Sequence, residues 1–99
     1  MAELTVICWR DIPAQVVVRA GREKVSMQLT DRFQEAIDLA ASRAGLIGTD
    51  EYLAEWRRRT RPCGEDLRAE AEAEVARLEA EFDEARLLAL ARAGGTEEA

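Results

Sequence analysis

The sequence predicts an α+β fold with a three-stranded antiparallel sheet, two short helices on one face of the sheet, and a long acidic C-terminal helix. Three observations predict it. Residues 4–29 contain three β-branched or alternating apolar segments separated by short turns. Residues 30–60 repeat apolar residues at helical spacing. Residues 65–93 are rich in Ala, Glu, Leu and Arg and contain no Gly or Pro.

The three predicted strands cover residues 4–9, 15–20 and 24–29. The first is β-branched and aromatic, and the third alternates between apolar and polar residues, which is typical of a half-buried strand. Pro13 follows the first strand. Because proline cannot donate a backbone hydrogen bond, it predicts a turn or a sheet edge at this point. The short connections favour an antiparallel meander.

The first helix is expected to begin after Thr30, a suitable N-cap, and to end at Gly45, a suitable residue just past a helix. Its predicted inner face repeats at intervals of three and four residues and consists of Phe33, Ala36, Ile37, Ala40, Ala41 and Ala44. This spacing is typical of one apolar stripe on an amphipathic helix.

A second short helix is expected from Thr49 onwards. Its predicted inner face consists of Tyr52, Leu53 and Trp56. The run Arg57–Arg59 would then lie at the C-terminal end of this helix, where cations are favoured. Pro62 and Gly64 are expected to stop it.

Residues 63–95 are predicted to form one amphipathic helix, followed by a disordered tail at 96–99. Its narrow apolar seam consists of Ala71, Val75, Leu78, Phe82, Ala85 and Ala89. Such a helix would be about 43 Å long, whereas a compact domain of this size has a radius of gyration near ~13 Å. The helix must therefore bend, break or project. We expect residues 1–62 to form an α+β domain that folds without it.

The charge is divided unevenly along the chain. The net charge is −6, and residues 1–64 carry +1 whereas residues 65–99 carry −7. This argues against a general nucleic-acid or anionic-membrane binder. The acidic helix could instead meet a basic surface, and Arg57, Arg58, Arg59 and Arg61 could supply that surface within the chain. The same four arginines could bind phosphate, although no Gly-rich phosphate loop accompanies them.

The residue types argue against an enzyme. The chain has no His and only two cysteines, Cys8 and Cys63. We therefore expect no catalytic residues, no metal site and no cofactor. Cys8 is interpreted as a core residue. Cys63 is either a loop cysteine without a role or a thiol whose pKa is lowered by nearby arginines. The chain has no apolar run long enough to span a membrane, and the N-terminus resembles no secretory signal, so we expect a cytoplasmic protein.

Two surfaces are candidates for binding a partner protein. Trp9, Arg10, Asp11 and Pro13 could form a recognition turn, because Trp and Arg are favoured interface anchors. Alternatively, Asp11 only forms the turn and pairs with Arg10. The second candidate is the seam of the long helix at Val75, Leu78 and Phe82. This seam must fold back onto the sheet, pair with a second copy or dock on a partner. Of the paired forms, an antiparallel homodimer is favoured over a parallel one.

Three strings of the sequence resemble a known family. They are WRDIPAQV at residues 9–16, RFQEAID at residues 32–38 and TDEYLAEW at residues 49–56. Together they resemble the small "virulence factor" family of bacteria, and the N-terminal part of the conserved virulence factor C proteins. The resemblance covers residues 4–60 and excludes the acidic helix. It implies no catalytic residues. Genes of the family that it resembles lie beside those of folate- and corrinoid-dependent methyl transfer, which implies an accessory subunit of a one-carbon enzyme.

These observations favour a non-enzymatic cytoplasmic module that binds another protein. The alternative is a small subunit of a folate- or corrinoid-linked methyl-transfer enzyme. A further alternative is phosphate or nucleic-acid binding through Arg57–Arg61.

Overall fold

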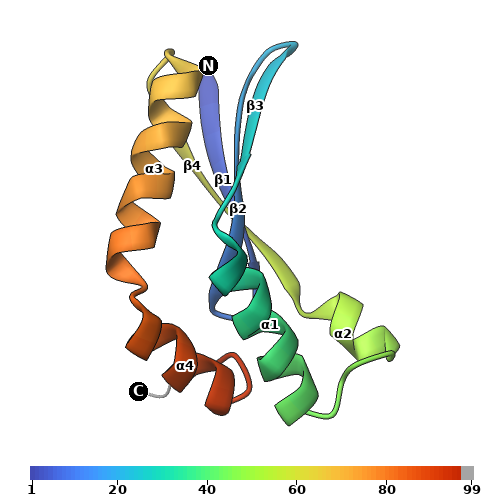
Figure 1. The fold of residues 1–99 in the computed structure, drawn as a ribbon. Helices are drawn as coiled ribbons and strands as arrows, with labels where there is room; N and C mark the ends of the chain where they lie inside the picture. The colour runs from blue at the N-terminus through green and yellow to red at the C-terminus, as the bar shows by residue number, and fades with distance from the viewer. Residues whose placement is uncertain (97–99) are drawn as a thin grey trace.

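The computed structural model describes residues 1–96 and shows an α+β fold with a four-stranded antiparallel sheet (Figure 1). The strands lie in the order β3-β2-β1-β4. The elements are β1 (Ala2–Trp9), β2 (Ile12–Ala20), β3 (Glu23–Gln28), α1 (Asp31–Arg43), α2 (Asp50–Ala54), β4 (Trp56–Cys63), α3 (Leu67–Glu81) and α4 (Glu84–Arg92). The expectation of three strands, two short helices and one long helix is therefore wrong. Among residues 1–96, no helix is both long and apolar enough to cross a membrane.

The N-terminal meander forms as the sequence predicts, but Pro13 lies inside β2 rather than in a turn. The tight β1–β2 turn consists of Arg10 and Asp11, and Arg10 adopts φ 52°. Pro13 pairs with Cys8 beside a register shift, where the β3 pairing has already ended. Proline is tolerated there because such irregular positions do not require its missing N–H group.

Strand β4 was not expected, because its sequence WRRRTRPC has no apolar alternation. Residues 56–63 pair antiparallel with β1, from Trp9 opposite Trp56 to Ala2 opposite Cys63. The prediction that Arg57–Arg59 end a helix is therefore wrong, since α2 stops at Ala54. An edge strand needs only one paired side, and charged side chains on it prevent further aggregation. This explains how so polar a segment can be a strand.

Helix α1 confirms the predicted stripe, because Phe33, Ala36, Ile37, Ala40 and Ala41 are all buried. It packs mainly against α4 and the beginning of β2, at the end of the sheet that carries the β1–β2 turn (Figure 1). In contrast, Leu53 of α2 was predicted to face the core and is exposed. Its neighbour Tyr52 lies half-buried and contacts Trp9.

The predicted long helix is broken into α3 and α4 at Phe82, whose backbone has φ −98° and ψ 74°. Asp83 then caps α4 by accepting a hydrogen bond from the backbone N–H of Arg86. The break turns α4 across the end of the sheet (Figure 1). The inner face of α4 therefore consists of Leu87, Leu90 and Ala91, whereas the predicted seam residues Ala85 and Ala89 are exposed.

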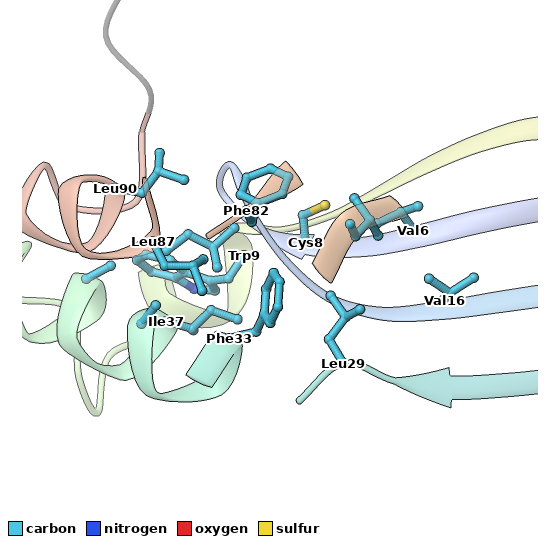
Figure 2. Packing of buried hydrophobic residues seen from close by; sticks show 14 of the residues in the cluster. Val6, Cys8, Trp9, Val16, Leu29, Phe33, Ile37, Phe82, Leu87 and Leu90 are labelled. Atoms are coloured by element: carbon cyan, nitrogen blue, oxygen red, sulfur yellow. The ribbon is translucent and has the colours of Figure 1, made fainter. Parts of the chain in front are cut away.

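One apolar core joins all these elements. Figure 2 shows Phe82 and Leu87 beside Trp9, with Phe33 and Ile37 of α1 on the other side. Phe33 and Phe82 meet edge to face with ring centroids 6.1 Å apart. The residues expected to form an independent domain, 1–62, thus share their core with α3 and α4. The predicted tail at 96–99 lies outside the described residues except for Thr96.

Candidate functional site at strand β4

The predicted recognition turn is not a surface anchor. Trp9 is 0% exposed, and Pro13 is also fully buried. The Trp9 ring stacks on Tyr52 at a centroid distance of 5.6 Å, and its Nε1–H donates to the Tyr52 carbonyl at 2.9 Å. Because a buried side chain cannot contact a partner without unfolding, Trp9 and Pro13 do not form the predicted recognition site.

Arg10 and Asp11 hold other parts of the chain in place. The Arg10 Nε–H donates to Glu55 at 2.6 Å, its Nη1–H donates to the Gly94 carbonyl, and its guanidinium lies over the Trp9 ring. The backbone N–H of Asp11 donates to the Gly95 carbonyl, and its carboxylate accepts from Arg59. The turn therefore ties the sheet to the segments that follow α2 and α4.

The second predicted surface, the seam of the C-terminal helix, is folded back onto the protein. Leu78 and Phe82 are buried, and Val75 is partly buried against the same core. Helix α3 runs along the sheet (Figure 1), and its contacts with the sheet are mainly with β2 and β3. Of the three possibilities for this seam, the structure therefore shows the first, in which the seam folds back onto the sheet. Val75, Leu78 and Phe82 pack against other parts of the same chain.

The predicted arginine cluster lies on β4 and divides between the two faces of the sheet. Alternate residues of a strand point to opposite faces, so Arg57, Arg59 and Arg61 share the face covered by α3. Arg58 and Thr60 lie on the opposite face, which no helix among residues 1–96 covers along β4. All of these side chains are exposed. Because the sequence pattern predicts that Arg57–Arg59 end a helix, it could not assign these arginines to the two faces of a sheet.

The outer edge of β4 exposes backbone hydrogen-bonding groups. The Arg10 N–H donates to the carbonyl of Glu55, the residue opposite it in the β1–β4 register. In an antiparallel pair, backbone groups point toward and away from the partner strand at alternate residues, so this bond shows which β4 residues face β1. By this alternation, the N–H and C=O groups of Arg58 and Thr60 point away from β1. The backbone of Pro62 also faces away from β1, so the missing N–H of this proline costs no hydrogen bond between β4 and β1. No other strand in the described part of the chain pairs with this edge.

A cleft of about 370 Å³ lies between β4 and α3. Its apolar lining consists of Leu4, Val6, Cys8, Pro13, Leu78 and Phe82. Its charged lining consists of Asp11, Arg59, Arg61, Glu74, Arg77, Glu81 and Arg86. Counted over residues 1–96, four guanidinium groups and three carboxylates line the cleft, an excess of one positive charge in an acidic chain.

Ion pairs cross this cleft. Glu74 is only 4% exposed and accepts from Arg77 at 2.6 Å and from Arg61 at 3.2 Å. Hydrogen bonds from Arg77, and then from Arg61, lower the pKa of Glu74 against the opposing effect of burial. Arg77 also pairs with Glu81, which pairs with Arg86. The acidic helix thus meets an internal basic surface at Arg61, as one interpretation of the sequence expected.

Sequence reasoning did not single out Glu74 and Arg77. The signal was present, because Glu74 follows Ala71 by three residues and precedes Leu78 by four. That spacing places it on the buried side of α3, and a buried carboxylate needs a cationic partner. Arg77 supplies one from the next turn of the same helix.

The surroundings of both cysteines raise the pKa of their thiols. Burial raises the pKa of the Cys8 thiol more than Arg59 lowers it. Burial, and then the neighbouring Glu70, raise the pKa of the Cys63 thiol against the opposing effect of Arg61. These neighbours disfavour the alternative in which arginines activate Cys63. Among residues 1–96, no three Cys, Asp or Glu side chains are grouped so that they could hold a metal ion.

Comparison with known proteins gives one match. The family model described as "Virulence factor" matches residues 7–91. No curated protein and no solved structure is significantly similar to the chain. The matched region includes all of α3 and most of α4. The expectation that the similarity ends near residue 60 and excludes the acidic helix is therefore wrong.

Proposed function

The chain belongs to the Virulence factor family, and we propose that it is a non-enzymatic module that binds another protein along the outer edge of β4. The partner contributes an extended acidic segment, which joins the sheet as a fifth strand. The observation that carries the proposal is an eight-residue edge strand whose outer side has no partner strand within residues 1–96, and which carries exposed arginines in an otherwise acidic chain. Strand addition of this kind is a common mode of peptide recognition.

Backbone geometry supports strand addition at this edge. The outward N–H and C=O groups of Arg58 and Thr60 are spaced to pair with one antiparallel segment. Each net hydrogen bond of this kind stabilises a complex by about 0.5–1.5 kcal/mol. The bonds fix the register of the partner, while side chains on either face supply specificity.

Charge supports an acidic partner rather than a second copy. A pair of β4 strands would bring two arginine-rich strands against each other, and like charges at that distance are destabilising. Arg58 is exposed and has no ion-pair partner among residues 1–96. A glutamate beside Arg58 would therefore gain a new pair without breaking an existing one.

The test uses a fluorescent peptide of alternating Val and Glu and measures its binding by anisotropy. Thr60→Pro removes one outward N–H group and no backbone hydrogen bond to β1, although it also loses the hydroxyl bond from Thr60 to Thr5 of β1. We expect a loss of about five-fold or more. Arg58→Glu reverses a charge beside the peptide and should weaken binding further. Binding should also weaken as salt is raised.

The matched controls lie close to these positions. Thr60→Val keeps the backbone N–H group, and Lys24→Glu makes a comparable charge reversal on β3, the opposite edge of the sheet. Both should leave the affinity nearly unchanged. Equal losses in Lys24→Glu and Arg58→Glu, or no effect of Thr60→Pro, would contradict binding at β4.

The identity of the partner is a separate part of the proposal. The resemblance of the sequence suggests an enzyme of folate- or corrinoid-linked methyl transfer. Copurification from the native host should then recover such an enzyme with the unaltered chain, and recover less of it with Thr60→Pro. Recovery of a different partner with the same dependence would support the edge and reject this enzyme class.

A further inference from the structure

The cleft between β4 and α3 lies on the face of the sheet opposite the side chain of Arg58, and Thr60 contributes to its wall between Arg59 and Arg61. Its volume, about 370 Å³, falls at the lower end of the range of small-molecule sites, roughly 300–1,000 Å³. Its floor is apolar, and the Cys8 side chain forms part of it. The cleft thus has the two parts that an amphipathic ligand requires, an apolar floor and a charged rim.

The rim has unused hydrogen-bond donors. Arg59 is 61% exposed, and only its Nη2 has a hydrogen-bond partner within residues 1–96, the Asp11 carboxylate at 3.1 Å. Arg61 uses Nη2 for Glu74 and Nη1 for the Pro62 carbonyl at a long 3.3 Å. A guanidinium has five N–H groups in a fixed fork, so Arg59 can bind a second carboxylate through two parallel hydrogen bonds.

We propose that this cleft binds a small monocarboxylate with an apolar body. The carboxylate binds to Arg59 at the rim, within reach of Arg61, and the apolar part lies over Val6, Cys8 and Leu78. This site is distinct from the strand-addition edge, because its ligand contacts Arg59 and not Arg58, although Thr60 borders both.

The net charge of the lining favours one negative charge on the ligand. Asp11, Glu74 and Glu81 already offset three of the four guanidinium groups. Among the charges of residues 1–96 in this lining, one added carboxylate balances the remaining positive charge, whereas a doubly charged phosphate would leave an excess negative charge beside these carboxylates. The alternative in which the arginines bind phosphate is therefore disfavoured on this face.

The experiment is a titration of the isotope-labelled protein with decanoate, followed by amide and arginine Nε–H chemical shifts. We expect shifts at Val6, Cys8 and the Nε–H of Arg59, and none at Lys24 on the far edge. Decanol has the same chain without the charge, so it should bind about ten-fold more weakly. Inorganic phosphate should not produce the same shifts.

Matched variants on β4 separate the two faces. Arg59→Gln should weaken decanoate binding about ten-fold, because it removes the charged fork. The fold should survive, since Arg59 is a surface residue whose ion pair with Asp11 is itself exposed to solvent. Arg58→Gln makes the same change on the opposite face and should have no effect.

Three outcomes would overturn the proposal: no shifts in the cleft, equal affinity for decanol and decanoate, or equal losses in Arg58→Gln and Arg59→Gln. None of them bears on the acidic-peptide test at the outer edge. Conversely, a failed peptide test with a positive decanoate titration would reject strand addition and keep the ligand site.

Discussion

At the scale of single residues, Trp9 is the point where distant parts of the chain meet. Its ring is covered by Tyr52 from α2, by the Arg10 guanidinium and by Gly95 after α4. A Cβ atom built on Gly95 would lie 2.9 Å from the Trp9 ring. Gly95 also has φ +93°, a conformation that other residues avoid. Only glycine satisfies both constraints at this position.

The first prediction follows from this contact. Gly95→Ala should lower the free energy of unfolding by about 2–4 kcal/mol, because it adds backbone strain and overpacks a fully buried ring. Gly21→Ala is the matched control, since Gly21 has φ +60° but a Cβ atom added there would meet nothing within 4 Å. It should lose only about 1 kcal/mol. Equal losses in urea denaturation would show that the Trp9 contact contributes nothing.

At the scale of elements, Glu79 and Arg32 join α3 to α1. The Glu79 carboxylate accepts from the backbone N–H and the hydroxyl of Thr30, at 2.7 and 2.9 Å. It therefore caps α1 from another helix, while the Thr30 side chain makes no capping bond of its own. In return, Arg32 donates to the Glu79 and Phe82 carbonyls at the end of α3. Each helix thus satisfies free backbone groups of the other.

A pH dependence follows from these bonds. Burial alone would raise the pKa of Glu79, but the hydrogen bonds from Thr30 and Arg32 lower it overall. A carboxyl group whose pKa is lower in the folded state stabilises the fold fully at pH values above its unfolded-state pKa, near 4.5. This stabilisation is lost as the pH falls below that value and through the folded-state pKa. The protein should therefore lose stability in acid, and Glu74 should contribute in the same direction.

The second prediction separates Glu79 from the other acidic residues. Glu79→Gln should cost about 1–2 kcal/mol at neutral pH and should lose less additional stability than the unaltered protein below about pH 4. Glu72→Gln is the control, because Glu72 lies exposed on the same helix and has no hydrogen bond within residues 1–96. Melting temperatures at several pH values measure both. A parallel fall with pH in both variants would contradict the capping role.

The elements that sequence reasoning predicted are those whose pattern reflects burial. The meander and α1 show alternation or helical spacing because one of their faces meets the core. Strand β4 has no such pattern, since its pairing with β1 is made by backbone groups and the side chains of residues 57–62 are exposed. The break at Phe82 was missed because neither Gly nor Pro marks it. Asp83, a common N-cap residue, was the available signal.

The candidate site was only partly predictable for the same reason. The four arginines were recognised as a cluster, but their division between two faces depends on the strand that the pattern concealed. Trp9 was expected at the surface because a Trp-Arg-Asp turn resembles an interface anchor. The segments that cover it, around Tyr52 and Gly95, are distant in the sequence.

At the scale of the whole molecule, the C-terminal half completes the core of the N-terminal half. Five large side chains after residue 62 are buried, namely Leu67, Leu78, Phe82, Leu87 and Leu90. Burying each contributes about 1.5–3 kcal/mol, so together they contribute about 7–15 kcal/mol. That amount is comparable to the entire stability of a typical domain, about 5–15 kcal/mol. We therefore expect that residues 1–62 do not fold as an independent domain.

The third prediction is that a fragment of residues 1–62 lacks a cooperative thermal transition and binds hydrophobic dyes, because one face of its sheet and the inner side of α1 are uncovered. A point variant tests the same core in the full chain. Phe82→Glu should cost more than about 3 kcal/mol, since it removes a buried ring that packs against Phe33. The Arg86 guanidinium over the Phe82 ring could pair with the new carboxylate, which would offset only part of this loss. Leu88→Glu on the exposed side of α4 is its control and should cost little. A sharp transition in the fragment, or equal melting temperatures for the two variants, would show that α3 and α4 are accessory to a domain that is complete without them.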